Sequence, residues 1–168
     1  MKKLVFPVEV LPVTQVVTGI VTQAFATLVF LIVLFVIRGH IPATVLWLPT
    51  ILIPQILFTM GLAWFLAALG VYLRDLGQVI GFLLTLWFFL TPICYPETSL
   101  QMSLSPEAAN ALTKNPAYVI VRAYRSTFLE GSAPAWHSAW KLWALAIAVF
   151  LLGHAWFYKL RKTFADVI

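Results

Sequence analysis

The stretch VYLRDLGQVIGFLLTLWFFLTPICYPE, from Val71 to Glu97, decides the fold of this chain. It carries an adjacent charge pair, Arg74 and Asp75, and then no charged residue until Glu97. A helix needs about 20 apolar residues to cross a bilayer, so this stretch has the length of one membrane span. Because ionised side chains are costly inside hydrocarbon, we expect the charge pair to lie at a membrane surface between two spans. Pro92 near the far end predicts that the helix breaks there.

The rest of the chain is as apolar as this stretch. Of its 168 residues, 62% are hydrophobic and 10% are charged, and the mean hydropathy is +0.95. Charged residues make up roughly a quarter of an ordinary soluble domain. The uncharged runs are long and continuous, whereas the strands of a transmembrane β-barrel give short alternating segments. The composition therefore predicts an all-α, polytopic membrane protein.

Four runs have the length and character of transmembrane helices. The second run contains Pro49 and Pro54, which we expect to kink the helix or delay its start, with a gating hinge as the alternative. Aromatic residues stand at both ends of the fourth run, as is typical of membrane interfaces. The predicted spans are about 10–37, 43–73, 76–96 and 140–158.

The loop between the third and fourth spans carries two helix-start signals. Ser105 is followed by Pro106 and an acid, and Asn115 is followed by Pro116, so each pair offers a capping side chain and a proline at the first helical position. The second segment places apolar and charged residues on opposite sides, up to Gly131. We predict two amphipathic outer-face helices, over about 105–114 and 116–130.

The basic residues predict an orientation. Four spans place both termini on one side of the membrane. The short segments on that side hold basic residues at high density, so the positive-inside rule makes the termini and the bend at Arg74 cytoplasmic. The net charge of +5 follows from this topology, and we expect no nucleic-acid partner. These basic residues are Lys2, Lys3, Arg74, Lys159, Arg161 and Lys162.

A polar stripe runs along the first span. Thr14, Thr18 and Thr22 recur every four residues, with Gln15 and Gln23 beside them, so they share one helix face. Two interpretations remain open. The stripe is either a packing face for another helix or a wall that offers hydrogen bonds to a polar solute.

Motifs for catalysis or cofactor binding are missing from the sequence. It has no G-x-x-x-x-G-K-[ST] loop for ATP, no nucleophile elbow and no pair of buried carboxylates. His40, His137 and His154 stand far apart, and Cys94 is the single cysteine, which excludes an internal disulfide. The sequence predicts no catalytic, cofactor-binding or metal-binding residues, and thus not an enzyme.

Several ordered segments closely resemble the permease subunit of bacterial ABC exporters for cell-surface polysaccharides of the O-antigen, capsule or teichoic-acid type. They cover almost the whole chain. The segments are KKLVFPVEVLPV at 2–13, YLRDLGQ at 72–78, LWFFLTPICYP at 86–96, NPAYVIVRAYR at 115–125 and FYKLRKTFADVI at 157–168.

The resemblance implies a homodimeric, multi-pass transport subunit in the bacterial cytoplasmic (inner) membrane. It would export a lipid-linked or lipid-anchored glycan, contact membrane lipid and pair with a separate nucleotide-binding ATPase subunit. That partner, and not this chain, would bind ATP and Mg²⁺. Permeases of this kind usually have six spans, so this chain looks like the last four of them, without the first two. The rival interpretation is a multi-span membrane enzyme or scaffold of glycolipid assembly, which would work without any ATPase.

The resemblance also implies roles for particular residues. One cytoplasmic elbow that couples to the ATPase would contain Lys2, Lys3 and Glu9. Arg74 and Asp75 would form the second elbow, either gripping the partner or making a local ion pair.

Further residues would face the translocation path or the outer surface. Aromatic rings could stack on sugars while polar side chains bind sugar hydroxyls, with plain packing or lipid contact as the alternative. The translocation-path residues are Thr18, Thr22, Gln23, Trp87, Phe88 and Tyr95, and those of the outer-face helices are Asn115, Pro116, Tyr124 and Arg125.

Overall fold

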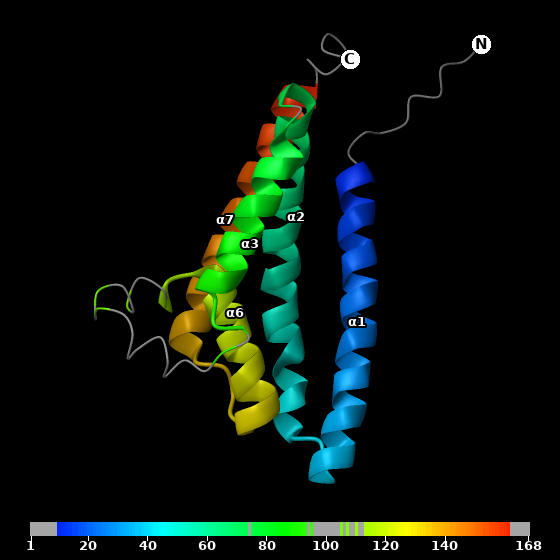
Figure 1. The fold of residues 1–168 in the computed structure, drawn as a ribbon, viewed down its shortest axis with the longest axis vertical. Helices are drawn as coiled ribbons and strands as arrows, with labels where there is room; N and C mark the ends of the chain where they lie inside the picture. The colour runs from blue at the N-terminus through cyan, green and yellow to red at the C-terminus, as the bar shows by residue number, and fades with distance from the viewer. Residues whose placement is uncertain are drawn as a thin grey trace, which may run out of the picture. The chain divides into compact units, whose positions relative to one another are not determined.

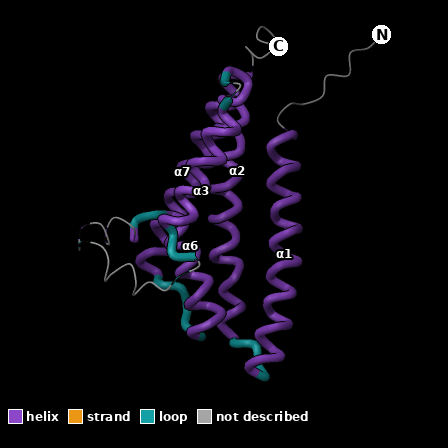
Figure 2. Tube along the Cα trace, viewed as in Figure 1, coloured by secondary structure: helices purple, strands orange, loops and turns teal. Residues whose placement is uncertain are grey.

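The computed structural model describes residues 10–73, 75–93, 95, 105, 107, 110 and 113–161. Within these ranges the chain forms helices and turns and no strand (Figure 1; Figure 2). The predicted class, an all-α polytopic membrane protein, is confirmed. In chain order the elements are α1 (Val10–Arg38), η1 (Ala43–Trp47), α2 (Leu48–Tyr72), α3 (Leu76–Leu90), α6 (Pro116–Arg125), η2 (Ser126–Glu130) and α7 (Trp136–Leu160).

Three helical segments among the described residues are long and apolar enough to cross a membrane. They are the 29 residues of α1, the 30 residues of η1 and α2 taken together, and the 25 residues of α7. These segments overlie the runs 10–37, 43–73 and 140–158 that the sequence predicted to be helical. A helix rises about 1.5 Å per residue, so each exceeds the roughly 30 Å of a bilayer core.

The third predicted span is shorter than expected. α3 has 15 residues and ends at Leu90, whereas the sequence predicted a helix to about residue 96. Thr91, the residue after it, has an extended backbone, with φ −94° and ψ 128°. This conformation suits the residue before a proline, and Pro92 then lacks the N–H that would continue the helix. α3 alone is about 22 Å long, less than the thickness of a bilayer core.

The two prolines of the second run act differently. Pro49 stands in the first turn of α2, after the 3₁₀ segment η1, where its missing N–H costs no helical bond. Pro54 lies inside α2, so the carbonyl of Thr50 loses its helical donor. The indole N–H of Trp143, in the first half of α7, donates to that carbonyl at 3.1 Å. The side chain of one helix thus replaces the backbone bond that proline removes from another.

The chain divides into two compact units. The first comprises Met1–Ile41, Ile56–Tyr72 and Ala146–Ile168, and so contains α1 and the later parts of α2 and α7. Its two long inner helices touch through glycines, because a Cβ on Gly153 would overlap the backbone of Gly61. Small residues of this kind let membrane helices approach closely. Ala68 and Phe157 form a buried cluster in the same unit.

The second unit comprises Pro42–Gln55 and Leu73–Leu145. The hydroxyl of Thr44 in η1 donates to the carbonyl of Thr127 in η2 at 2.6 Å. The rings of Trp47 and Trp136 meet edge to face at 5.5 Å. Gly131 ends η2 with a left-handed φ of 63°, so the predicted stop at this residue is confirmed. The helix predicted over 116–130 is therefore α6 followed by the π-helical turn η2.

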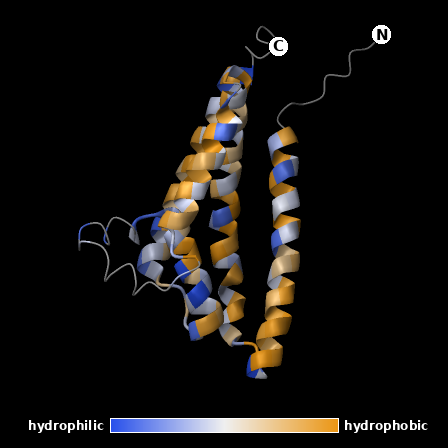
Figure 3. Cartoon of the chain, in the orientation of Figure 1, coloured by the Kyte–Doolittle hydropathy of each residue, from blue (hydrophilic) through white to orange (hydrophobic). Residues whose placement is uncertain are grey.

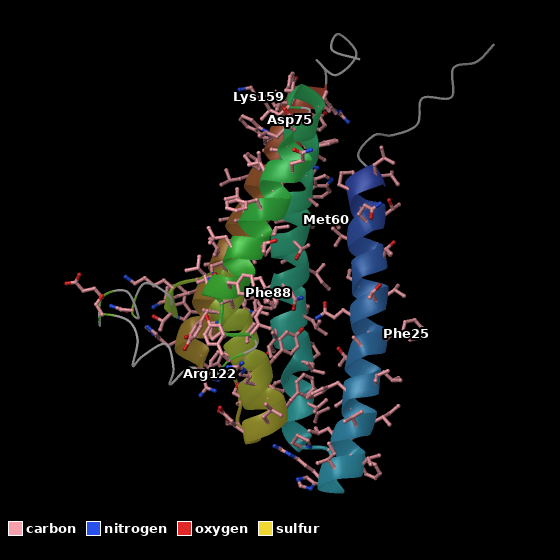
Figure 4. All side chains as sticks on the ribbon, in the orientation of Figure 1. Phe25, Met60, Asp75, Phe88, Arg122 and Lys159 are labelled. Atoms are coloured by element: carbon pink, nitrogen blue, oxygen red, sulfur yellow. The ribbon has the colours of Figure 1, made fainter. Side chains whose placement is uncertain are left out.

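α1 buries little of its surface within the chain. Only Pro12, Val16 and Leu34 are buried along its length, and Phe25 projects outward with 67% of its surface exposed (Figure 4). The first half of α1 carries the hydrophilic residues, and the second half is almost entirely hydrophobic (Figure 3). Such a helix needs lipid or other protein around it, because an apolar surface of this extent is unfavourable in water.

Candidate functional site

Asn115 organises the join between α3 and α6. It is the N-cap of α6, and its side-chain oxygen accepts a hydrogen bond from the backbone N–H of Ala117 at 3.1 Å. Pro116 occupies the first turn, where its fixed φ suits a helix start. The second loop helix starts where the sequence predicted it.

The same amide also binds the end of α3. The indole N–H of Trp87 donates to Oδ1 of Asn115 at 2.8 Å, and Nδ2 of Asn115 donates to the hydroxyl of Thr91 at 3.2 Å. Thr91 is 1% exposed, and its hydroxyl donates in turn to the carbonyl of Trp87. We call Trp87, Thr91 and Asn115 the amide junction. Sequence reasoning assigned Trp87 to the translocation path and Asn115 to the outer face, and it missed Thr91.

Arg125 holds the turn that follows α3. Its Nη2 donates to the carbonyls of Ile93 at 3.0 Å and Tyr95 at 3.3 Å. The hydroxyl of Tyr95 donates to the carbonyl of Phe89 at 2.7 Å, which satisfies one of the open carbonyls at the end of α3. α6 therefore binds α3 and the turn after it from both of its own ends.

Tyr124 connects α6 to the first part of α2. Its hydroxyl donates to Oε1 of Gln55 at 2.9 Å, and its ring stacks on Phe128 at 5.9 Å. Gln55 was not singled out in the sequence, because a lone glutamine in an apolar run gives no signal of its partner 69 residues away.

A cavity of about 360 Å³ lies beside α6 and the first turns of α7. The ion pair between Arg122 and Glu130 lines the cavity, and both side chains are nearly half exposed. The ring of Tyr118 also lines it. Figure 4 shows Arg122 on α6. Since the wall offers hydroxyls, a cation and an anion together, it can both donate to and accept from a polar ligand. We call this cavity the hydroxyl pocket, and its hydroxyl-bearing residues include Thr50, Ser126, Ser132 and Ser138.

The polar stripe of α1 is exposed, but its hydroxyls bond to their own helix. Thr14, Thr18 and Thr22 each donate to a backbone carbonyl three or four residues earlier, at 2.8, 2.9 and 3.0 Å. Their protons are therefore used, and each oxygen is left with acceptor capacity. Gln23 beside them is half-buried. The two interpretations of the stripe stay open.

The remaining translocation-path prediction, Phe88, lies near the end of α3 (Figure 4). It is 43% exposed, and its ring meets Phe89 edge to face at 5.6 Å. An aromatic surface is thus available there, next to the carbonyl that binds Tyr95.

The predicted elbow residues are only partly described. Lys2, Lys3, Glu9 and Arg74 lie outside the described residues, as does most of the predicted helix over 105–114. Asp75 is exposed and begins α3, although its side chain does not cap the helix. Its backbone carbonyl accepts from Gln78 at 3.1 Å. Figure 4 shows Asp75 at that helix end.

Within the described ranges, no three His, Cys, Asp or Glu side chains lie together as a metal site would require. The histidines have local contacts instead. His40 lies 3.0 Å from the carbonyl of Arg38, His137 lies beside Lys141, and the ring of His154 packs on Trp64.

Known proteins of similar sequence identify the family. Residues 1–129 match the family model of the ABC-2 type transporter. The O-antigen export system permease protein RfbA of Myxococcus xanthus is 32% identical over 167 residues. Two proteins of the same name from Klebsiella pneumoniae are each 28% identical, over 171 and 169 residues. Each comparison covers 99% of this chain and 63% of the relative, so the chain spans less than two thirds of the length of these curated relatives. Because the family model covers most of the sequence, the chain belongs to the ABC-2 type transporter membrane family.

Proposed function

We propose that this chain is a transmembrane subunit of an ATP-driven exporter that moves lipid-linked or lipid-anchored polysaccharide across the bacterial cytoplasmic membrane. The observation that carries the proposal is the ABC-2 family match, together with relatives named as O-antigen export permeases. Three helical segments of membrane-spanning length agree with an integral membrane subunit.

ATP and Mg²⁺ are bound by a separate ATPase subunit in this proposal, and the permease acts as a homodimer. Two cytoplasmic elbows, one with Lys2, Lys3 and Glu9 and the other with Arg74 and Asp75, contact that subunit. Closure of the ATPase then moves the spans, as in other rigid-body switches. The fold supports a mechanical role for the second elbow. Asp75 begins α3, and the amide junction ties the other end of α3 to α6.

The hydroxyl pocket supports a polar, hydroxyl-rich cargo. A sugar presents donors and acceptors in similar number, and the pocket offers the Arg122 guanidinium, the Glu130 carboxylate and several hydroxyls. Phe88 adds an exposed aromatic face in the same unit. These side chains fit a saccharide better than an apolar or a purely anionic solute.

The test uses two charge-balanced double variants of the full chain, co-expressed with the ATPase of an O-antigen exporter. Arg74→Ala/Asp75→Ala alters the elbow, and Arg122→Ala/Glu130→Ala alters the pocket without changing the net charge. We expect the elbow variant to lower the amount of co-purified ATPase by about tenfold, as truncation of a paired charge at an interface does. The pocket variant should keep the ATPase but lose glycan export.

Unchanged association and export in the elbow variant would remove the elbow assignment. Turnover of a glycolipid by the purified chain without any ATPase would favour the membrane enzyme instead.

A further inference from the structure

A second cavity, of about 330 Å³, lies within the second unit, where α6 and α7 begin. Lys114, His137 and Lys141 contribute its polar wall, and Leu142 and Leu145 contribute an apolar wall. None of the described lining residues carries a carboxylate. We call this cavity the lysine pocket.

The lysine pocket concentrates positive charge from two separate segments. Lys114 immediately precedes the N-cap of α6, and Lys141 stands one turn after His137 on α7, with its Nζ 2.8 Å from Nε2 of that ring. Pro116 and Ser138 also line the cavity, and both belong to the first turns of their helices. Helix N-termini carry a partial positive charge, so they favour anions nearby. Two ammonium groups and two helix starts around one cavity fit a phosphate group.

The apolar wall distinguishes a lipid phosphate from a free one. Leu142 is buried and Leu145 is 40% exposed, so the α7 surface continues from the lysines into apolar side chains. α7 is long and apolar enough to cross a membrane, and the pocket lies at its first turns. Trp136 and Trp140 in the same turns are 63% and 56% exposed, as is typical of residues at the headgroup level. A single lysine at the end of a membrane helix commonly extends to the membrane–water interface without forming a binding site. Here two lysines from different segments line one cavity.

We propose that the lysine pocket binds the phosphate headgroup of an anionic membrane lipid. The lipid's hydrocarbon chain lies along the α7 surface at Leu145, which is exposed. This site is separate from the transport activity proposed above, and binding there does not depend on an ATPase or a glycan.

The test measures phosphatidylglycerol retained by the full chain. The protein is reconstituted in phosphatidylcholine bilayers that contain phosphatidylglycerol, extracted in neutral detergent and examined by native mass spectrometry. Lys114→Gln and Lys141→Gln should each lower retention by about fivefold, and the double variant more. The control double variant Arg38→Gln/Lys159→Gln removes the same number of charges from helix ends in the other unit and should retain the lipid. Lys114→Arg/Lys141→Arg keeps the charge and should also retain it.

Two competition results separate the sources of phosphate. Retention that survives millimolar inorganic phosphate supports a lipid ligand, whereas displacement by inorganic phosphate overturns it. Equal losses in the glutamine variants and the control, or no loss in either, would also overturn the site.

Discussion

At the scale of single residues, Trp143 supplies the hydrogen-bond donor that Pro54 removes from α2. Proline frees the carbonyl of Thr50, and the indole N–H of Trp143 binds that carbonyl at 3.1 Å. Trp143→Phe keeps most of the ring's packing but leaves a carbonyl inside the protein without this donor. We expect a loss of about 1–2 kcal/mol in the free energy of unfolding, measured by denaturant titration in detergent.

The control for this prediction is a double-mutant cycle. In a Pro54→Ala background, residue 54 regains an N–H that can bond to Thr50 along the helix. Trp143→Phe should then cost about 1 kcal/mol less than it does beside proline. Equal costs in both backgrounds would show that the indole acts by packing alone. No sequence pattern predicts this pair, because the two partners are 93 residues apart.

α3 and α6 are joined, at the scale of elements, by a side chain that also starts one of them. Asn115→Ala removes the cap of α6 and both bonds to α3, so we expect the unfolding free energy to fall by about 2–3 kcal/mol. Asn115→Asp keeps a capping oxygen and an acceptor for Trp87, and loses only the donor to Thr91. Its cost should be about 1 kcal/mol. A loss of the same size in both variants, measured by thermal unfolding, would mean that the cap and the bond to Trp87, which Asn115→Asp keeps, contribute nothing.

Local signals in the sequence predicted where helices start and stop. They did not predict which side chains meet between helices. The Asn115–Pro116 start and the Gly131 stop are short-range effects of capping and backbone conformation, so the sequence located both. Pro92 predicted the break in the third span, and α3 ends at Leu90, just before that proline, whereas the bound of about residue 96 followed the apolar run beyond it. The bond between Trp87 and Asn115 spans 28 residues and depends on how two helices meet, which periodicity does not encode.

At the scale of the whole molecule, hydropathy predicted the membrane class, but it did not predict the exposure of α1. A helix with three buried residues in 29 buries little of its surface against the described part of the chain, so lipid or another protein must surround it. The long uncharged runs sufficed for the class because hydrocarbon excludes charge over a whole span. How the spans contact one another depends on details such as Gly61 and Gly153, which look like ordinary small residues in the sequence.

Orientation in the membrane is the property that basic residues predict for the molecule as a whole. In a Cys94→Ser background, we would introduce single cysteines by Arg38→Cys, Asp75→Cys, Glu130→Cys and Lys159→Cys, and label intact cells with a membrane-impermeant maleimide. Positions 38 and 130 should react in intact cells, and positions 75 and 159 only after permeabilisation, because the densest basic segments stay in the cytoplasm. All four residues lie at or beyond helix ends, so labelling reports the side of the membrane and not burial in a span. If position 75 reacted in intact cells, the topology would be the inverse of the one predicted. The ATPase could then not contact the bend between α2 and α3.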